Sequence, residues 1–258
     1  MNIYALPEFS GRFRPIWQRN FLVWKKLALA SVLGNIADPL ITLIAFGYGL
    51  GSLLHQINGI PYIHYLASGS ICMSIMMASS FEALYSAFSR MHVQKTWDAL
   101  LNAPLALDDI VLAEMLWAAT KALISGVAIL GVMFALGIGL HLHTVLVLPL
   151  LFLIGMTFAS LGLVFNALAK GYDFFTYYFT LMLTPMIFLS GVYYPTAQLP
   201  GWLQIVSHLL PLSAAVNLVR PLLLGSWPVA PIADLTILLA YCGLGFYVAV
   251  VLTRRRLL

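Results

Sequence analysis

Six long apolar segments set the limits on what this chain can fold into. They are Ala28–Leu54, Tyr62–Phe88, Ile110–Ile138, Thr144–Ala169, Phe174–Val192 and Ile232–Leu252. A helix needs about 20 apolar residues to cross the hydrocarbon core of a bilayer. A spanning segment must also satisfy its backbone hydrogen bonds internally, which favours helices. The pattern therefore predicts an all-α integral membrane protein with six transmembrane helices.

Composition supports this class and one domain. The chain is 62% hydrophobic and 9% charged, whereas soluble domains carry about 25% charged residues. No polar stretch between the segments is long enough to bury a core of its own. We therefore expect a single transmembrane domain over residues 1–258. Cys72 and Cys242 both lie inside apolar segments and are interpreted as small core residues.

The basic residues predict the orientation, because Lys and Arg collect on the cytoplasmic side of a membrane. With six spans, both termini lie on one side, and that side holds most of the 13 Lys and Arg residues. These are Arg12, Arg14, Arg19, Lys25, Lys26, Arg90, Lys95, Lys170, Arg254, Arg255 and Arg256. The opposite side holds only Arg220, and Lys121 lies within a span. Both termini are predicted to be cytoplasmic, with Arg254–Arg256 binding lipid headgroups. No nucleic-acid partner is expected, since the positive charge flanks the spans.

An amphipathic segment, residues 15–28, precedes the first span. At 100° per residue its large apolar side chains share one face, with Leu22 as the exception on the polar face. This favours a helix lying in the membrane interface. The alternative is a plain extension of the first span.

The most polar segment between spans is residues 90–104. On a predicted helix from Val93 to Asn102, one face would carry Val93, Trp97, Leu100 and Leu101. Pro104 would stop this helix, and Asp108 could cap the next one. A short helix between two long spans can pass a push from a cytosolic partner into the membrane. An ordinary interfacial connector explains the pattern equally well.

Residues 195–224, on the opposite side, are too apolar for a solvated loop yet are broken repeatedly by proline. We expect two short helices, about Pro200–Leu210 and Leu212–Leu224, that dip into the outer leaflet without crossing it.

Ionisable residues inside spans usually face a bundle interior or an aqueous path. They are Asp38, Glu82, Glu114, Lys121 and Asp234. Boundary snorkelling or a structural pair is an equally good explanation for each. The residues chosen as candidates for a translocation path or gate are Glu82, Lys121, Phe188, Tyr193, Tyr194 and Arg220. No metal site is predicted.

No Gly-x-x-x-x-Gly-Lys-Ser/Thr loop occurs in the chain, so the usual cradle for ATP phosphates is missing. No nucleophile and base with a recognisable local context occur either. We therefore expect no catalytic residues.

Several segments together resemble a known family. They are residues 17–26, 31–34, 88–99 and 109–114, with the more general pattern at residues 183–195, Leu199-Pro200, Pro211-Leu212 and Arg220. In these the chain is similar to permeases of the type-2 exporter class of ABC transporters, and among them to those of nodulation systems. The resemblance covers most of the chain.

The resemblance implies an interfacial elbow helix, a coupling helix within residues 90–103 that sits in a cleft of an ATPase subunit, and re-entrant helices near the exit. The coupling residues would be Arg90, Val93, Lys95, Trp97, Asp98 and Leu101. Two permeases and two ATPases would form an exporter in the bacterial inner membrane, with ATP and Mg²⁺ bound by the ATPases. The cargo in nodulation systems is a lipo-chitooligosaccharide, which implies an amphiphilic cargo. Trp97→Ala or Asp98→Ala is then expected to uncouple ATP hydrolysis from transport without affecting insertion.

Two other functions fit the residues alone. A secondary transporter driven by an ion gradient would use Glu82, Glu114 and Lys121 as a relay, although no inverted repeat between the halves is evident. An intramembrane enzyme would need Ser190 or His208, and neither has a recognisable catalytic neighbour.

Overall fold

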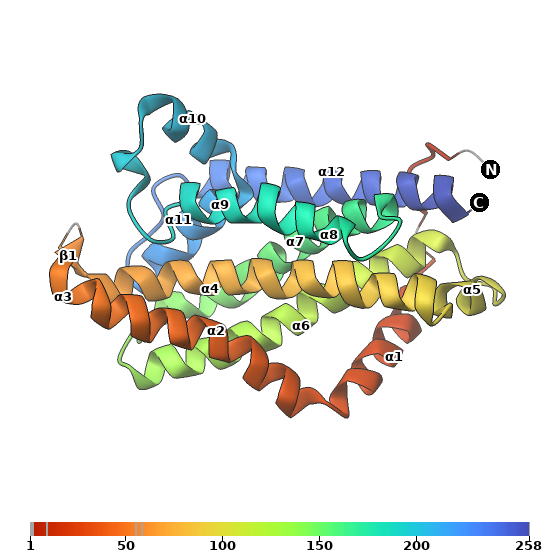
Figure 1. Ribbon diagram of the computed structural model, residues 1–258, viewed down its shortest axis with the longest axis horizontal. Helices are drawn as coiled ribbons and strands as arrows, with labels where there is room; N and C mark the ends of the chain where they lie inside the picture. Colours follow the sequence, from red (N-terminus) through yellow and green to blue (C-terminus); the bar gives the residue numbers. More distant parts are fainter. Residues whose placement is uncertain (1–2, 9, 55, 58, 258) are drawn as a thin grey trace.

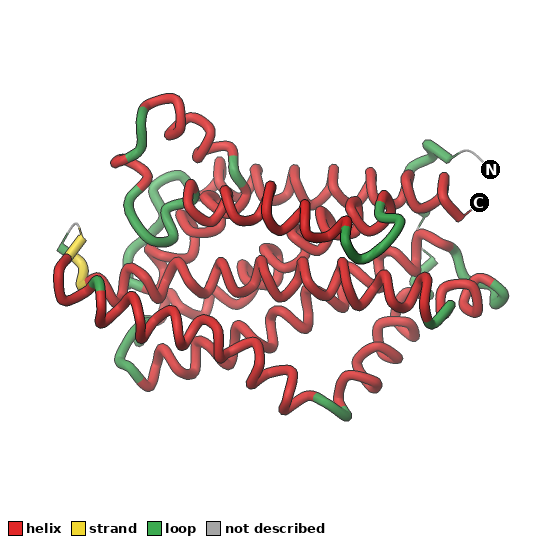
Figure 2. The backbone as a smooth tube through the Cα atoms, in the orientation of Figure 1, coloured by secondary structure: helices red, strands yellow, loops and turns green. Residues whose placement is uncertain are grey.

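The computed structural model describes residues 3–8, 10–54, 56–57 and 59–257, and most of them are helical. The side chain of Asp38, one of the predicted intramembrane ionisable groups, lies outside the described part. The long helices run side by side along the longest axis of the molecule (Figures 1 and 2). The prediction of an all-α protein is confirmed.

The described part of the chain contains twelve α-helices, five short helical segments of other types and one small hairpin. The α-helices are α1 Phe13–Lys25, α2 Ala28–Gly49, α3 Gly51–Leu54, α4 Tyr62–Phe81, α5 Thr96–Leu101, α6 Leu107–Ala135, α7 Val147–Leu168, α8 Phe174–Tyr177, α9 Thr184–Leu189, α10 Gly201–Leu209, α11 Pro211–Leu223 and α12 Pro231–Leu257. Three π-helical segments are η1 Glu82–Ser86, η2 Ser89–Val93 and η4 Tyr178–Leu183, and two 3₁₀ segments are η3 Leu142–Leu146 and η5 Thr196–Gln198. Strands β1 Gln56–Ile57 and β2 Ile60–Pro61 pair antiparallel, with Ile57 opposite Ile60.

Five helical stretches among the described residues are long and apolar enough to cross a membrane. They are Ala28–Leu54, Tyr62–Val93, Leu107–Ala135, Leu142–Leu168 and Pro231–Leu257. The second runs past its predicted end at Phe88, because the π-helical turns η1 and η2 continue α4 up to Val93. Arg90 is therefore part of a long helix and not of the connecting loop.

The predicted fifth span is shorter than expected. Phe174–Val192 is observed as an apolar helix from Phe174 to Leu189, formed by α8, η4 and α9. At 1.5 Å per residue its length is about 24 Å, less than the roughly 30 Å hydrocarbon core. It ends at Ser190 because Gly191 has a φ of 72°, a left-handed conformation that glycine adopts at little cost.

Helix α7 lies at the centre of the packing, against α4, α6 and α12. Small residues let these helices approach closely. A Cβ atom on Gly155 of α7 would lie 3.0 Å from the Cα atom of Ala119 in α6. Close backbone approach of this kind is how helices associate in lipid, where no hydrophobic effect drives them together.

Helix α1 confirms the predicted amphipathic helix but is no extension of the first span. It ends at Lys25, and the chain turns at Lys26 and Leu27 before α2 begins. Figure 1 shows the two helices meeting at an angle. The buried residues of α1 are Ile16 and Asn20. That α1 lies in the membrane interface stays a prediction.

The two short helices predicted for residues 195–224 are present as α10 and α11. They form a bent pair at 82° to each other, broken at Leu210. Pro211 occupies the first turn of α11, where its missing N–H costs nothing. Re-entry of this pair into a membrane stays a prediction.

Both described ends of the chain lie at one end of the molecule, together with α5 (Figure 1). The β1–β2 hairpin and α10 lie at the opposite end. This arrangement agrees with an even number of passes. We call the two ends the α5 end and the α10 end.

Candidate functional site

A buried network of charged side chains joins α4 and α6 near the α5 end. The continuation of α4 contributes Glu82, Ser86 and Arg90, which are spaced four residues apart. Helix α6 contributes Glu114 and Lys121, which are seven residues apart. Both spacings bring side chains to one face of a helix, so the two faces meet along a single seam.

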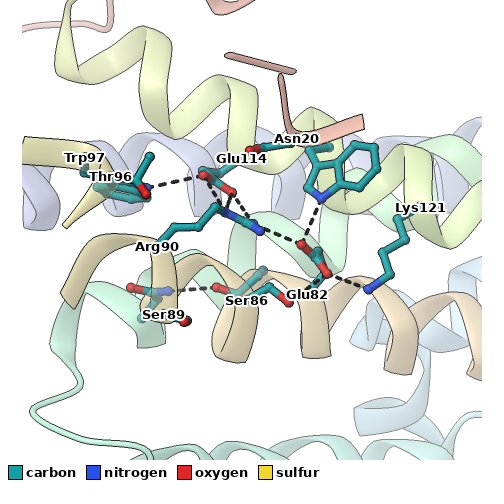
Figure 3. A network of polar contacts seen from close by, with 12 residues as sticks. Asn20, Glu82, Ser86, Ser89, Arg90, Thr96, Trp97, Glu114 and Lys121 are labelled. Carbon is teal, nitrogen blue, oxygen red and sulfur yellow. Dashed lines mark hydrogen bonds and ion pairs between the residues drawn. The ribbon is translucent and has the colours of Figure 1, made fainter. Parts of the chain in front are cut away.

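Arg90 bridges two carboxylates at the centre of this network (Figure 3). Its Nε donates to both carboxylate oxygens of Glu114, at 3.0 and 3.1 Å, and its Nη2 donates to Oε2 of Glu114 at 2.5 Å. The same Nη2 lies 3.0 Å from Oε1 of Glu82. The planar guanidinium supplies the fork of donors that such a bidentate contact requires.

Glu82 is held by three further donors. Lys121 Nζ lies 2.7 Å from Oε2, Trp117 Nε1 lies 2.8 Å from Oε1, and Ser86 Oγ lies 2.9 Å from Oε2. The side chains of Glu82 and Glu114 are 3% and 1% exposed. Two carboxylates and two cations make the network neutral, and the added hydrogen bonds offset the cost of removing these charges from water.

Helix α5 is attached to the same network. Trp97 is 1% exposed, and its Nε1 lies 3.3 Å from Oε1 of Glu114. The turn into α5 is set by Lys95, which has a φ of 50°. Movement of α5 would therefore act directly on Glu114 in α6 and, through Arg90, on α4.

The predicted coupling residues fall into two groups. Arg90 and Trp97 face into the protein, so Trp97→Ala would also remove a buried side chain. That this variant uncouples ATP hydrolysis from transport stays a prediction. Lys95 and Asp98 are exposed, and Leu101 is half-buried. The predicted helix from Val93 to Asn102 is wrong at its start, because the left-handed turn at Lys95 separates Val93, 66% exposed, from α5.

A second polar cluster lies toward the α10 end, around Arg220 of α11. Its Nη2 donates to the carbonyl oxygen of Gly191 at 2.7 Å, and its Nε donates to Ser68 Oγ at 3.0 Å. The guanidinium carbon lies 3.7 Å from the centroid of the Tyr65 ring, which is a cation–π contact. Tyr65 also donates its hydroxyl to Gly191, at 3.0 Å. Arg220 thus ties the turn after α9 to α4.

The candidate path residues do not form one site. Tyr193 packs against Phe188, with ring centroids 5.8 Å apart, close to the Arg220 cluster. Tyr194 is half-buried in the same turn. Glu82 and Lys121 belong instead to the charged network near the α5 end. Ser68 and Glu82 are separated by about 21 Å of helix at 1.5 Å per residue.

The start of α6 has a buried ion pair that sequence reasoning missed. Asp108 pairs with Arg254 of α12, whose Nε lies 2.9 Å from Oδ1, and both residues are 2% exposed. Asp108 does not cap α6, since its Oδ2 accepts from the backbone N–H of Glu8 at 2.9 Å. The expectation that Arg254 binds lipid headgroups is therefore wrong. Arg256 donates to the carbonyl of Ala167 at 2.9 Å.

Sequence reasoning also missed Trp117, whose indole N–H donates a hydrogen bond to Glu82. The spacing of Glu114, Trp117 and Lys121 on one face of α6 is the signal that could have identified it. Tryptophan is usually interpreted as core or interface in a membrane helix, which hides its role as a donor.

Comparison with known proteins identifies the class. The family model for ABC-2 type transporters matches residues 12–224. The chain belongs to the ABC-2 type transporter family. Nodulation protein J of Rhizobium meliloti (strain 1021) is 43% identical over 256 residues, which cover 99% of this chain and 98% of that protein. Nodulation protein J of Rhizobium leguminosarum bv. trifolii is 45% identical over 257 residues, covering 100% and 98%.

A more distant relative is inner membrane transport permease YadH of Escherichia coli (strain K12). It is 24% identical over 200 residues, 77% of each chain. The matches confirm the resemblance to this family and to nodulation protein J. As an ABC-2 protein, the chain is a multi-pass transport permease and a non-catalytic membrane subunit.

Proposed function

We propose that this chain is the permease subunit of an ATP-driven exporter, powered by a separate ABC ATPase. Two copies of the chain and two ATPases would form the transporter, and ATP and Mg²⁺ would be bound by the ATPases. The chain would lie in the bacterial inner membrane with the α5 end in the cytoplasm. The cargo would be amphiphilic, such as a lipo-oligosaccharide, in keeping with the relatives named for nodulation.

One observation supports the proposal most directly: α5 is exposed on one side and tied to the spans on the other. Lys95 and Asp98 present charge to a partner, while Trp97 contacts Glu114, which Arg90 joins to Glu82. A force on α5 would thus reach α4 and α6 through short, buried, directional contacts. Exit of the cargo would follow at the α10 end, beside Arg220.

The same network argues against the gradient-driven alternative. A proton relay needs a carboxylate that can change its charge and its partners. Glu82 and Glu114 are each held by cations and have side chains 3% and 1% exposed. Carboxylates held in this way are better suited to transmit force than to carry protons.

The test is a pull-down of the tagged chain from native membranes, with ATPase activity assayed in the eluate. We expect a stoichiometric ABC ATPase subunit, which Asp98→Ala loses because Asp98 is exposed on α5. Gln198→Ala, exposed at the α10 end, is the matched control and should retain the ATPase. An ATPase-free oligomer, under conditions that preserve known ABC complexes, would contradict the proposal. Loss of transport on collapsing the proton gradient, with ATP maintained, would then support the secondary transporter.

A further inference from the structure

A polar pocket of about 180 Å³ lies between α1 and the charged network. Helix α1 lines it with Arg19, Asn20 and Trp24, and the network lines it with Glu82, Arg90 and Lys121. A water molecule takes about 30 Å³ of liquid volume, so the pocket has room for a group the size of a phosphate. Figure 3 draws Asn20 together with the charged network, and Asn20 lines the same pocket as Glu82 and Arg90.

Two buried donors at this pocket have no partner among the described residues. Asn20 is 4% exposed, and its Oδ1 accepts a hydrogen bond from Nη1 of Arg19 at 3.2 Å. Because a guanidinium can only donate, this contact fixes the orientation of the amide. The Nδ2 of Asn20 is left buried and unpaired, as is Nε1 of Trp24. Unpaired buried donors are costly and rare in native proteins.

The charges around the pocket indicate which acceptor is missing. Arg19, Arg90 and Lys121 line the pocket together with the carboxylate of Glu82. Arg90 also pairs with Glu114, so these five side chains carry one net positive charge. Glu82 already accepts from Arg90, Lys121, Trp117 and Ser86. Among the described residues, the Nζ of Lys121 makes one hydrogen bond, to Oε2 of Glu82 at 2.7 Å, although an ammonium has three N–H donors. The N–H donors that still lack an acceptor therefore lie in a positively charged environment. An anionic oxygen group would accept hydrogen bonds from them.

The other side of α1 favours a lipid as the source of that group. There a largely apolar groove of about 600 Å³ is lined in part by Phe13, Trp17 and Phe21. Phe21 packs against Trp24, with ring centroids 6.0 Å apart, so the groove and the pocket adjoin the same aromatic wall. A phospholipid combines an anionic phosphate with apolar chains.

We propose that this pocket binds the phosphate group of a membrane phospholipid, with Asn20 Nδ2 and Trp24 Nε1 as the donors that recognise it. The bound lipid would hold α1 against α4 and α6 at the charged network. The proposal requires only that the chain lies in a membrane. It is independent of the identity of the ATPase and of the cargo.

The experiment is native mass spectrometry of the full-length protein in detergent, titrated with dioleoylphosphatidylglycerol. The wild type is expected to bind one lipid per chain in a saturable way. Asn20→Asp keeps the shape but replaces a donor with a negative charge, and should weaken binding about tenfold or more. Trp24→Phe keeps an aromatic ring without the N–H and should weaken it about threefold. Trp202→Phe is the matched control, since Trp202 is 68% exposed on α10, at the opposite end of the molecule, and lines neither the pocket nor the groove.

Three results would overturn the proposal. The first is unchanged lipid binding in both Asn20→Asp and Trp24→Phe. The second is equal binding of dioleoylglycerol, which has no phosphate. The third is displacement of the lipid by submillimolar inorganic phosphate, which would identify free phosphate as the ligand. Melting curves will show whether each variant folds. If Asn20→Asp does not fold, lipid binding by Trp24→Phe decides the question.

Discussion

At the scale of single residues, Arg90 determines whether the network is stable. It is the only cation among the described residues that contacts both Glu82 and Glu114, and its side chain is 13% exposed. Breaking one partner out of a buried ion pair leaves an uncompensated charge, which is far more costly than replacing the whole pair.

Arg90→Met is therefore expected to destabilise the protein by about 3–5 kcal/mol, seen as a lower melting temperature in detergent. Adding Glu114→Gln should recover part of this loss, because Glu82 keeps Lys121 as its partner at 2.7 Å. Arg255→Met, which removes an exposed cation at the same end, is the control. Equal melting temperatures for Arg90→Met and the control would show that the network does not stabilise the fold.

At the scale of elements, α5 owes its position to the turn that precedes it. Lys95 has a φ of 50° and is the only described non-glycine residue with a positive φ. That conformation is unfavourable for most L-residues and worst for β-branched ones, whereas Asn tolerates it. Lys95 therefore has two separable properties, its backbone conformation and its exposed charge.

Two substitutions separate these properties. Lys95→Val should lower stability by about 1–2 kcal/mol, because valine resists the left-handed conformation. Lys95→Asn should keep the melting temperature of the wild type and yet weaken retention of the ATPase in the pull-down, since only the charge is lost. Identical stability of the two variants would mean that α5 can form without this turn.

At the scale of the whole molecule, the arrangement places α5 and both described chain ends together, with α10 at the far end (Figure 1). Long helices separate the two ends, and the α5 end includes Arg90 and Lys95 before α5 and Arg254–Arg256 at the end of α12. By the positive-inside rule, this end should face the cytoplasm.

Cysteine labelling tests this orientation. The native Cys72 and Cys242 are 0% and 7% exposed, so they should not react with a membrane-impermeant maleimide. Asp98→Cys should be labelled only in inside-out vesicles, and Gln198→Cys only in intact spheroplasts. Labelling of both variants from the same side would contradict the proposed topology.

The sequence by itself determined the class of protein, the approximate limits of most spans, the amphipathic α1 and the bent pair of helices before the last span. These depend on local properties: the length of apolar runs, helical periodicity and the position of prolines. It also singled out Arg90, Glu82, Glu114, Lys121 and Arg220, because charged residues are rare in such a chain.

Only the tertiary structure decided which of these charges meet. Glu82 and Lys121 were expected on a path with Arg220, yet they join Arg90 near the α5 end, about 21 Å of helix from Ser68, a ligand of Arg220. Asp108 and Arg254 are 146 residues apart and pair with each other. Contacts of this kind depend on how helices distant in sequence pack, and on turns such as Lys95. Hydropathy and periodicity report on one helix at a time and carry no information about its neighbours.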